Sequence, residues 1–416
     1  MRKKLALTLL FPVFLAACGG GGGSDDDDTP PPVTETPPPD DSAPPPPVDP
    51  VTQASLATAA QLGLAPIAGN TDSVRVYDLV ADMGDSWRLT LNLDTGAYTL
   101  AVLYTAYDLT GTSGTFARTA NGAFSTVTGA GGVFTLLIDD RTRTIAGTVA
   151  LGGMTASVSG TAYAAPVDRA VLAGTYLLDL YARALPSESD DGTPPLPVEY
   201  QATFGALRIG ADGASALCVE STFNAEGRCV DPDGDENPPF PAEVSLNQAD
   251  GLLHAVVTQS DEQTLDLGPI RVQAGDRGPV LALDVPREGD AIFPITGVTY
   301  LVRQQALQGT EMDGAWTCSS SGKPTGTLSI SGTALAWTDA DGATRRTTLQ
   351  YNQHAYRDDD PTALPGLASA VFTATPTDGT EPEFDSEYLL PLSASLLLVA
   401  DYRYPGTMST CHISGN

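Results

Sequence analysis

The stretch WRLTLNLDTGAYTLAVLY, residues 87–104, alternates apolar and polar side chains on either side of Asp94, Thr95 and Gly96. Alternation with a period of two is typical of a strand that buries one face. A short polar run with glycine between two such strands indicates a tight turn. The stretch is therefore predicted to form a β-hairpin, and it decides the fold class because the same pattern recurs along the chain.

Further hairpins are predicted to turn at residues 139–143, Asp212-Gly213, Asp250-Gly251 and Asp341-Gly342. Asp-Gly tolerates the positive φ that a type I′ turn requires, so turns of this type are expected at these pairs. One short helix is predicted, at residues 54–64. Short strands at this spacing indicate an all-β fold of antiparallel meanders, arranged as sandwiches or barrels.

The meander divides into two or three domains, since 416 residues exceed the usual length of one domain. The predicted boundaries are residues 70–165, 166–305 and 306–416. Weak internal likeness supports the last two. GTYLLDL from residue 174 and GAWTCSS from residue 314 are interpreted as equivalent opening strands. The stretches FGALRIGADGASAL and TGTLSISGTALAW, which follow them, are interpreted as equivalent hairpins. The alternative is that segments 166–305 and 306–416 form one larger body.

The N-terminus has the features of an export signal. Arg2, Lys3 and Lys4 precede an apolar run that is too short to span a bilayer, as in a secretory signal peptide. The run ends in Leu15-Ala16-Ala17-Cys18, which resembles the lipobox of bacterial lipoproteins. The resemblance implies that residues 1–17 are a signal peptide and that Cys18 carries the lipid. It also implies export to the outer membrane, because Gly19 stands where an aspartate favours retention at the inner membrane.

Residues 18–69 are predicted to be a disordered tether. The segment opens with glycines and aspartates and continues with three proline runs, and residues 19–50 contain no aromatic residue, Leu, Ile or Met. Such a composition buries too little apolar surface to offset the entropy of ordering. Polyproline II runs stiffen the segment, so it is expected to hold a folded body away from the membrane.

The composition narrows the classes of partner. The chain has 51 Asp and Glu against 21 Lys and Arg, a formal net charge of −30. Nucleic-acid binding depends on basic patches, so nucleic acid is excluded as an expected partner. Acidity of this kind favours solubility and leaves protein or glycan ligands open. The expected membrane contact is therefore the lipid on Cys18 and not the folded body.

Four cysteines remain after Cys18. An even number in an exported protein predicts two disulfides, and three pairings are open. The preferred pairing is Cys218–Cys229, which closes a short loop, and Cys318–Cys411, which joins the start of the last segment to its end. Zinc is disfavoured because the chain has no C-x-x-C motif.

The loop CVDPDGDENPP contains the one candidate metal site. Asp231, Asp233 and Asp235 alternate along it, and oxygen-rich loops suit Ca²⁺. The EF-hand pattern fails, because Glu236 stands at the sixth position and Ala242 at the twelfth. The alternative is a solvated acidic loop beside a disulfide, with no cofactor at all.

No catalytic constellation stands out. The chain has no G-x-S-x-G motif, and its glycine run neither follows a strand nor opens a helix. His254, His354 and His412 are the available histidine bases, and each is interpreted as structural. The three tryptophans, Trp87, Trp316 and Trp337, are expected in the core rather than on a ligand-stacking surface.

Residues 133–163, VFTLLIDDRTRTIAGTVALGGMTASVSGTAY, resemble the small barrel of surface lipoproteins such as transferrin-binding protein B. The shared features are an alternating strand, an Asp-containing turn, an I-x-G step and a closing S-G-T. The resemblance implies a β-barrel for this segment and carries over no binding residue.

The sequence thus favours a lipid-anchored envelope protein that binds a protein or glycan ligand without catalysis, facing either the periplasm or the cell surface. A tether with rigid β-domains presents loops at a distance from a membrane. Two alternatives stay open. One is an envelope hydrolase with an acidic, Ca²⁺-dependent site, and the other is an accessory factor for another envelope protein.

Overall fold

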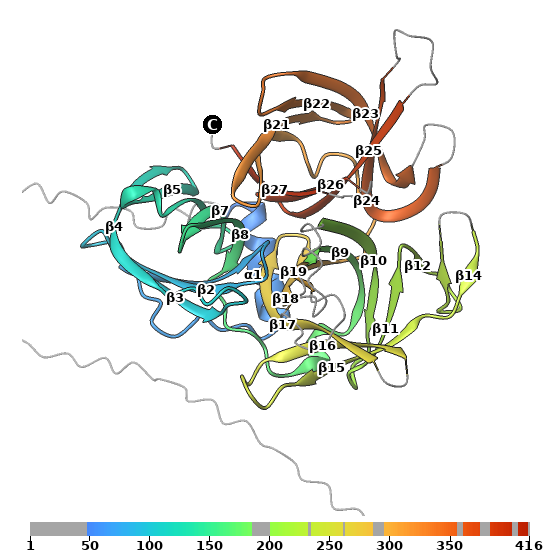
Figure 1. Ribbon diagram of the computed structural model, residues 1–416, viewed down its shortest axis with the longest axis horizontal. Coiled ribbons are helices and arrows are strands. Elements are labelled where there is room, and N and C mark those ends of the chain that lie inside the picture. The colour runs from blue at the N-terminus through green and yellow to red at the C-terminus, as the bar shows by residue number, and fades with distance from the viewer. Residues whose placement is uncertain are drawn as a thin grey trace, which may run out of the picture. The chain divides into compact units, whose positions relative to one another are not determined.

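The strands close into three antiparallel barrels of the up-and-down type (Figure 1). The structure, a computed structural model, describes residues 48–184, 200–231, 234–260, 263–285, 295–355, 361–374, 383–401 and 407–414. The predicted all-β fold is confirmed, and barrels rather than sandwiches are the form it takes. Cys18, the signal peptide and the proline runs of the tether lie outside the described residues.

Barrel 1 contains the hairpin predicted at residues 87–104. Its strands are β1 (Val74–Ala81), β2 (Ser86–Asn92), β3 (Ala97–Tyr104), β4 (Thr112–Asn121), β5 (Phe124–Gly129), β6 (Phe134–Asp139), β7 (Thr144–Leu151) and β8 (Met154–Thr161). The barrel closes where β1 pairs with β8. Trp87, Leu89 and Leu91 alternate inward along β2 and are almost fully buried, as the period of two predicts.

Barrel 2 is formed by a longer segment with an insertion. Its strands are β9 (Gly174–Ala184), β10 (Tyr200–Ile209), β11 (Ala214–Val219), β15 (Phe240–Leu246), β16 (Leu253–Ser260), β17 (Gln263–Gly275), β18 (Gly278–Val285) and β19 (Ile295–Arg303). The barrel closes where β19 pairs with β9. The insertion is a small sheet of β12 (Thr222–Phe223), β13 (Cys229–Val230) and β14 (Glu236–Asn237).

Barrel 3 repeats the plan of barrel 1. Its strands are β20 (Gly314–Ser320), β21 (Lys323–Ser331), β22 (Ala334–Asp339), β23 (Thr344–Ala355), β24 (Pro361–Ala374), β25 (Glu383–Ser393), β26 (Leu396–Asp401) and β27 (Thr407–Ile413). It closes where β20 pairs with β27. GTYLLDL and GAWTCSS both form the first strand of a barrel, so the proposed equivalence holds in the topology.

Both predicted disulfides are confirmed. Cys318 and Cys411 are register partners on β20 and β27, so their bond fastens the seam at which barrel 3 closes. Cys218 on β11 is bonded to Cys229 on β13, which ties the inserted small sheet to barrel 2. A cross-link removes loop-closure entropy from the unfolded chain, and the loop of 93 residues closed by Cys318–Cys411 is far longer than the loop of 11 closed by Cys218–Cys229.

The turn type predicted at the Asp-Gly pairs is wrong. Gly213, Gly251 and Gly342 have positive φ, whereas the aspartate before each does not. A type I′ turn requires positive φ at both central residues, so these hairpins use longer turns in which glycine alone takes the left-handed conformation. The aspartate still stabilises the turn: at Asp212-Gly213, the carboxylate of Asp212 accepts the N–H of Ala214.

The helix begins earlier than predicted. Helix α1 spans Pro50–Gln61, because Asp49 caps it by accepting the N–H of Thr52 and a proline occupies its first turn. Ser55 on its buried face donates a hydrogen bond to the carbonyl of Ala274 in barrel 2. The described part of the predicted tether, residues 48–69 of 18–69, thus includes a helix that contacts barrel 2.

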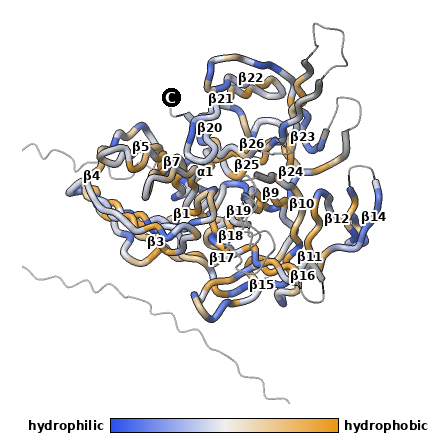
Figure 2. The backbone as a smooth tube through the Cα atoms, in the orientation of Figure 1, coloured by the Kyte–Doolittle hydropathy of each residue, from blue (hydrophilic) through white to orange (hydrophobic). Residues whose placement is uncertain are grey.

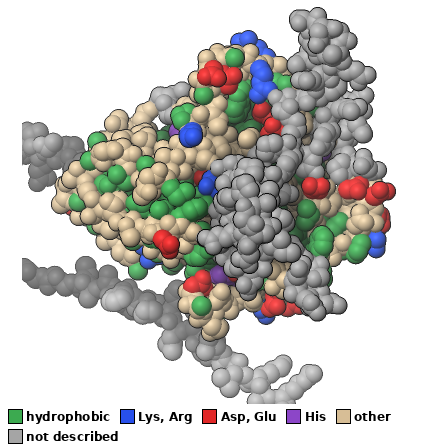
Figure 3. All heavy atoms as spheres, viewed as in Figure 1, with side chains coloured by type: hydrophobic (Ala, Val, Ile, Leu, Met, Phe, Trp, Pro, Cys, Tyr) green, Lys and Arg blue, Asp and Glu red, His purple; other side chains and the backbone are tan. Residues whose placement is uncertain are grey.

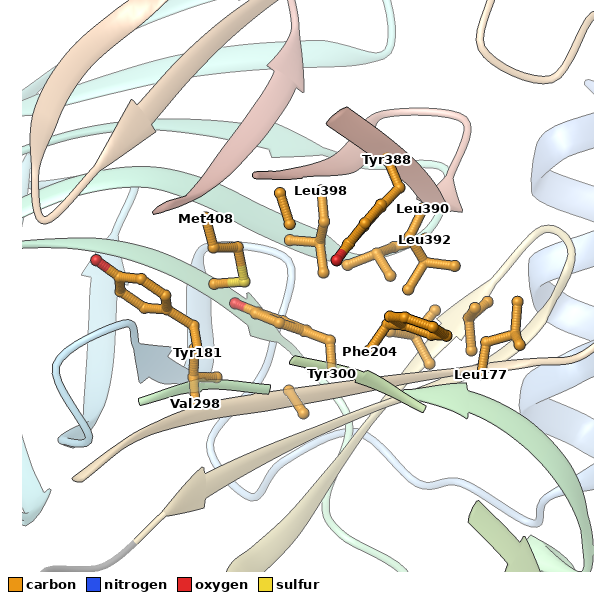
Figure 4. Packing of buried hydrophobic residues seen from close by; sticks show 14 of the residues in the cluster. Leu177, Tyr181, Phe204, Val298, Tyr300, Tyr388, Leu390, Leu392, Leu398 and Met408 are labelled. Carbon is orange, nitrogen blue, oxygen red and sulfur yellow. The ribbon is translucent and has the colours of Figure 1, made fainter. Parts of the chain in front are cut away.

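Outer faces of all three barrels meet in one apolar group, here called the shared cluster. Figure 4 shows how its members from barrels 2 and 3 pack against one another. Its members are Val80, Ala146, Leu177, Tyr181, Ala202, Phe204, Val280, Ala282, Val298, Tyr300, Val302, Leu364, Leu367, Tyr388, Leu390, Leu392, Leu396, Leu398, Ala400 and Met408. Figure 2 shows hydrophobic residues recurring along the strands of each barrel. Many strands are thus buried on both faces, and residues 48–416 form one compact unit.

Polar contacts join the barrels beside the shared cluster. The carboxylate of Asp82 accepts the N–H groups of Ser157 in its own barrel and Ser321 in barrel 3. The hydroxyls of Ser159 in barrel 1 and Tyr300 in barrel 2 lie 3.0 Å apart. Because these groups are buried, each depends on a partner in the neighbouring barrel for its hydrogen bond.

Candidate functional site

A cleft of about 730 Å³ opens between barrel 1 and barrel 2, beside the segment that follows α1. We call it the cleft. It is lined by Ile67, Ala68, Asp78, Ser86, Arg88, Leu103, Tyr104, Ala164, Ala165, Asn247, Asp250, Leu252, His254, Asp266, Pro269 and Arg271. Most of these residues come from β1, β2 and β3 on one side and from β16, β17 and the loop before β16 on the other. The segments before β1 and after β8 supply Ile67, Ala68, Ala164 and Ala165. The volume lies in the range of small-molecule sites.

An ion pair forms the wall of the cleft on barrel 1. Asp78 and Arg88 are register partners on β1 and β2, and both point outward because their neighbours Leu79 and Trp87 point into the barrel. Arg88 donates Nε to Asp78 Oδ1 at 2.7 Å and Nη2 to Oδ2 at 2.9 Å. This forked contact raises the pKa of Arg88 and occupies both oxygens of Asp78.

A second arginine faces this pair from barrel 2. Arg271 lies on β17 between Ile270 and Val272, which point into the barrel, so its side chain is directed out of barrel 2. That side chain is only 7% exposed, and its Nε lies 4.0 Å from Asp78 Oδ2. Among the described residues no acceptor is within hydrogen-bonding distance of this Nε. Burial lowers the pKa of Arg271, yet a guanidinium stays charged at neutral pH.

A histidine between two carboxylates forms the barrel 2 side of the cleft. His254 Nδ1 lies 2.8 Å from Asp266 Oδ2, and His254 Nε2 lies 2.8 Å from Asp250 Oδ2. Burial acts to lower the pKa of His254, but the two carboxylates more than offset it, so the pKa is raised. Protonation gives both ring nitrogens a hydrogen to donate, which matches two acceptors.

A buried carboxyl lies beside Arg271. Asp284 on β18 is fully buried, and this burial raises its pKa to about 8, against the opposing effect of the Ser86 hydroxyl. Burial thus favours the neutral form of Asp284, whereas the neighbouring charge of Arg271 favours the ionised form.

The residues that the sequence singled out lie elsewhere, with one exception. Trp87, Trp316 and Trp337 are buried in the barrels as predicted, and His354 stacks on Phe204 at 4.8 Å between centroids. His254 is the exception, because its strand position places it in the cleft. Sequence reasoning missed Asp78, Arg88 and Arg271; the one signal for them is a charged residue at an outward position of a strand.

The candidate calcium loop is only partly described. Asp233 lies outside the described residues. Asp231 Oδ1 accepts the N–H of Asp235 at 2.8 Å, so this carboxylate closes the turn. Within the described ranges no group of three or more His, Cys, Asp or Glu is arranged to hold a metal ion. Figure 3 shows acidic side chains in several separate places on one face, over the part of it that the structure describes.

The fold and the cleft define a three-barrel β-protein with a charged cleft between its first two barrels. No family model matches the chain, and neither the curated proteins nor the solved structures include a match. No helix in the described ranges has the length and apolar character needed to cross a membrane.

Proposed function

We propose that this chain is a lipoprotein of the bacterial cell envelope, anchored at the outer membrane through lipid on Cys18. In this proposal the three-barrel body is a non-enzymatic binding module, and the cleft is its ligand site. The observation that carries the proposal is the cleft itself. It is lined by apolar side chains and by two sets of charged side chains. These lie on strands of two barrels that pack against each other through the shared cluster.

The state of His254 supports binding over catalysis. A general base needs a free nitrogen within reach of the proton that it removes. Both ring nitrogens of His254 lie 2.8 Å from carboxylate oxygens, and a raised pKa favours the protonated ring. This histidine is therefore poised to shape the charge of the cleft rather than to activate a nucleophile.

The anchor is tested by cell fractionation. Two or more acyl chains hold a protein stably on a membrane, whereas a protein without them is released. Cys18→Ser is expected to move the protein out of the membrane fraction, and Cys218→Ser together with Cys229→Ser should leave it there. Retention of Cys18→Ser in the membrane fraction would refute the lipoprotein part of the proposal.

The ligand site is tested by blocking the cleft. Ala164 is exposed on the cleft wall, so Ala164→Trp fills space there without changing any charge. Ala120→Trp on exposed β4 is the matched control. Ligand-observed NMR with a mixed panel of neutral, cationic and anionic fragments is expected to give binders that Ala164→Trp loses and Ala120→Trp keeps. A panel in which every binder survives Ala164→Trp would contradict the proposed site.

A further inference from the structure

The guanidinium of Arg271 is buried in the wall of the cleft, and its Nε has no hydrogen-bond acceptor among the described residues. We propose that the cleft binds an organic anion, whose carboxylate or phosphate oxygens accept hydrogen bonds from the guanidinium of Arg271. The inference rests on the proposed function, because it assigns a ligand class to the same site.

The first step is the bonding state of Arg271. A guanidinium has five N–H donors in a planar fork, and burying it without acceptors is costly. Arg271 is 6% exposed, and its nearest carboxylate contact within the described part of the chain, Asp78, is 4.0 Å away. Its Nε donor is buried with no acceptor. Because this Nε is fully buried, the Nη groups of Arg271, which lines the cleft, are the donors that a ligand can reach.

The second step is the local charge. Both oxygens of Asp78 already accept hydrogen bonds from Arg88, so one carboxylate faces two guanidinium groups. Asp78, Arg88 and Arg271 all line the cleft, so this end of its wall has two guanidinium groups to one carboxylate. The Arg88–Asp78–Arg271 end of the cleft therefore carries an excess positive charge, which an anion would neutralise.

The third step is the opposite side. Asp250 and Asp266 are the acidic groups there, and both share a hydrogen bond with His254. A protonated His254 cancels part of their charge, so their repulsion of an anion at Arg271 is reduced. The anionic group of the ligand accordingly belongs at the arginine end of the cleft.

The fourth step is the apolar wall. Leu103 is 40% exposed although it is a large hydrophobic residue, and Ile67, Leu252 and Pro269 line the same cleft. Contact with these groups would remove apolar surface from water. The ligand class is therefore an acidic group carried on an apolar or aromatic body.

The test is a ligand-observed NMR titration of the purified full-length protein with phenyl phosphate, using protein-free detergent as the blank. Benzyl alcohol is the neutral comparison, since it keeps the ring and loses the charge. The expected result is that phenyl phosphate binds at least tenfold more tightly than benzyl alcohol. Charge-assisted, forked hydrogen bonds from arginine give this preference.

Variants assign the contact. Arg271→Gln is expected to weaken phenyl phosphate binding at least tenfold, and Ala164→Trp, which leaves every charge in place, is expected to weaken it as strongly. The control is Arg75→Gln, because Arg75 lies in a separate hollow of about 320 Å³ on barrel 1. It should leave the affinity unchanged. If Arg271→Gln does not fold, the Ala164→Trp variant and the neutral comparison still decide the question.

The outcomes separate the two proposals. Equal binding of phenyl phosphate and benzyl alcohol, both blocked by Ala164→Trp, overturns the anion inference and leaves the cleft as a binding site. Phenyl phosphate binding that survives both Arg271→Gln and Ala164→Trp overturns the inference, since the anion then binds elsewhere. Absence of binding by phenyl phosphate at millimolar concentration also overturns it.

Discussion

The outer face of β1 takes part in two kinds of contact only two residues apart. Val80 lies in the shared cluster, packed among side chains of all three barrels, whereas Asp78 lies on the wall of the cleft in a forked ion pair with Arg88. Both side chains are almost fully buried. The same strand therefore joins barrels through apolar packing at one point and presents charge to an open space at the next.

Two buried aspartates sharpen this comparison. Asp78 in the cleft has a guanidinium on both of its oxygens. Asp179 on β9 stands opposite Phe204 and Tyr300, which belong to the shared cluster, and burial alone raises its pKa to about 7. Asp78 has cationic partners among the described residues, whereas Asp179 has none there, so burial disfavours the charged form of Asp179. The difference shows that the cleft is equipped to hold charge and the cluster is not.

The largest expected effect concerns Asp179. Its folded pKa is raised above the unfolded value, so its contribution to stability is complete below about pH 4 and is lost as the pH rises through about 7. In the natural protein this carboxyl should lower the unfolding free energy by roughly 4 kcal/mol between pH 4 and pH 8. Asp179→Asn stays neutral at both pH values, so the variant should not show this decrease. Urea denaturation of both proteins at pH 4 and pH 8 measures the difference.

Asp82 and Asp284 also have raised pKa values, about 6 and about 8, and they keep part of the pH dependence in the variant. The decisive result is therefore whether stability falls less steeply with pH in Asp179→Asn than in the natural protein. If stability falls with pH as steeply in Asp179→Asn as in the natural protein, this carboxyl does not become neutral in the shared cluster.

The second prediction removes packing from the shared cluster. Leu398 on β26 is fully buried there, so Leu398→Ala should lower the unfolding free energy by about 3 kcal/mol through lost burial and the cavity left behind. Leu103→Ala on the cleft wall is the matched control. Leu103 is 40% exposed, and its truncation should cost less than about 0.5 kcal/mol. Equal losses in thermal denaturation would mean that the cleft wall is as tightly packed as the cluster.

The third and smallest effect comes from the cleft ion pair. Asp78→Asn leaves Arg88 and Arg271 facing each other with no carboxylate between them, and it should cost about 2 kcal/mol of stability. Asp140→Asn is the control, because Asp140 and Arg118 form an exposed pair with a separation of 3.8 Å. Such a pair contributes at most about 1 kcal/mol. A cost for Asp78→Asn no larger than that of the control, by urea denaturation, would contradict the described charge balance.

Particular residues show what the sequence could predict. The alternation of Trp87, Leu89 and Leu91 places three core positions of barrel 1, and the spacing of Cys318 and Cys411 indicates the bond that closes barrel 3. Asp-Gly marks the hairpins, although the turn type differs. The strand and turn features depend on local geometry, and the disulfides on a choice among three pairings of four cysteines. Both can therefore be predicted from a single sequence.

The cleft could not be predicted in the same way. Alternation tells which side chains point out of a barrel, but not whether another barrel covers them. Arg88 directly after Trp87, and Arg271 between Ile270 and Val272, appear as ordinary outward residues until barrel 2 is placed against barrel 1. The run VYDLVA in β1 carries the available signal, since apolar residues at successive positions indicate a strand that is buried on both faces.

The central claim is that the cleft, and not the shared cluster, is the place where this protein meets a ligand. The most direct measurement is a crystal structure of the protein soaked in phenyl phosphate. The account predicts the phosphate oxygens within hydrogen-bonding distance of Arg271, the ring against Leu103, and no change in the packing around Tyr300 and Leu398. A structure with the cleft empty and the compound bound at another place on the barrels would contradict the account.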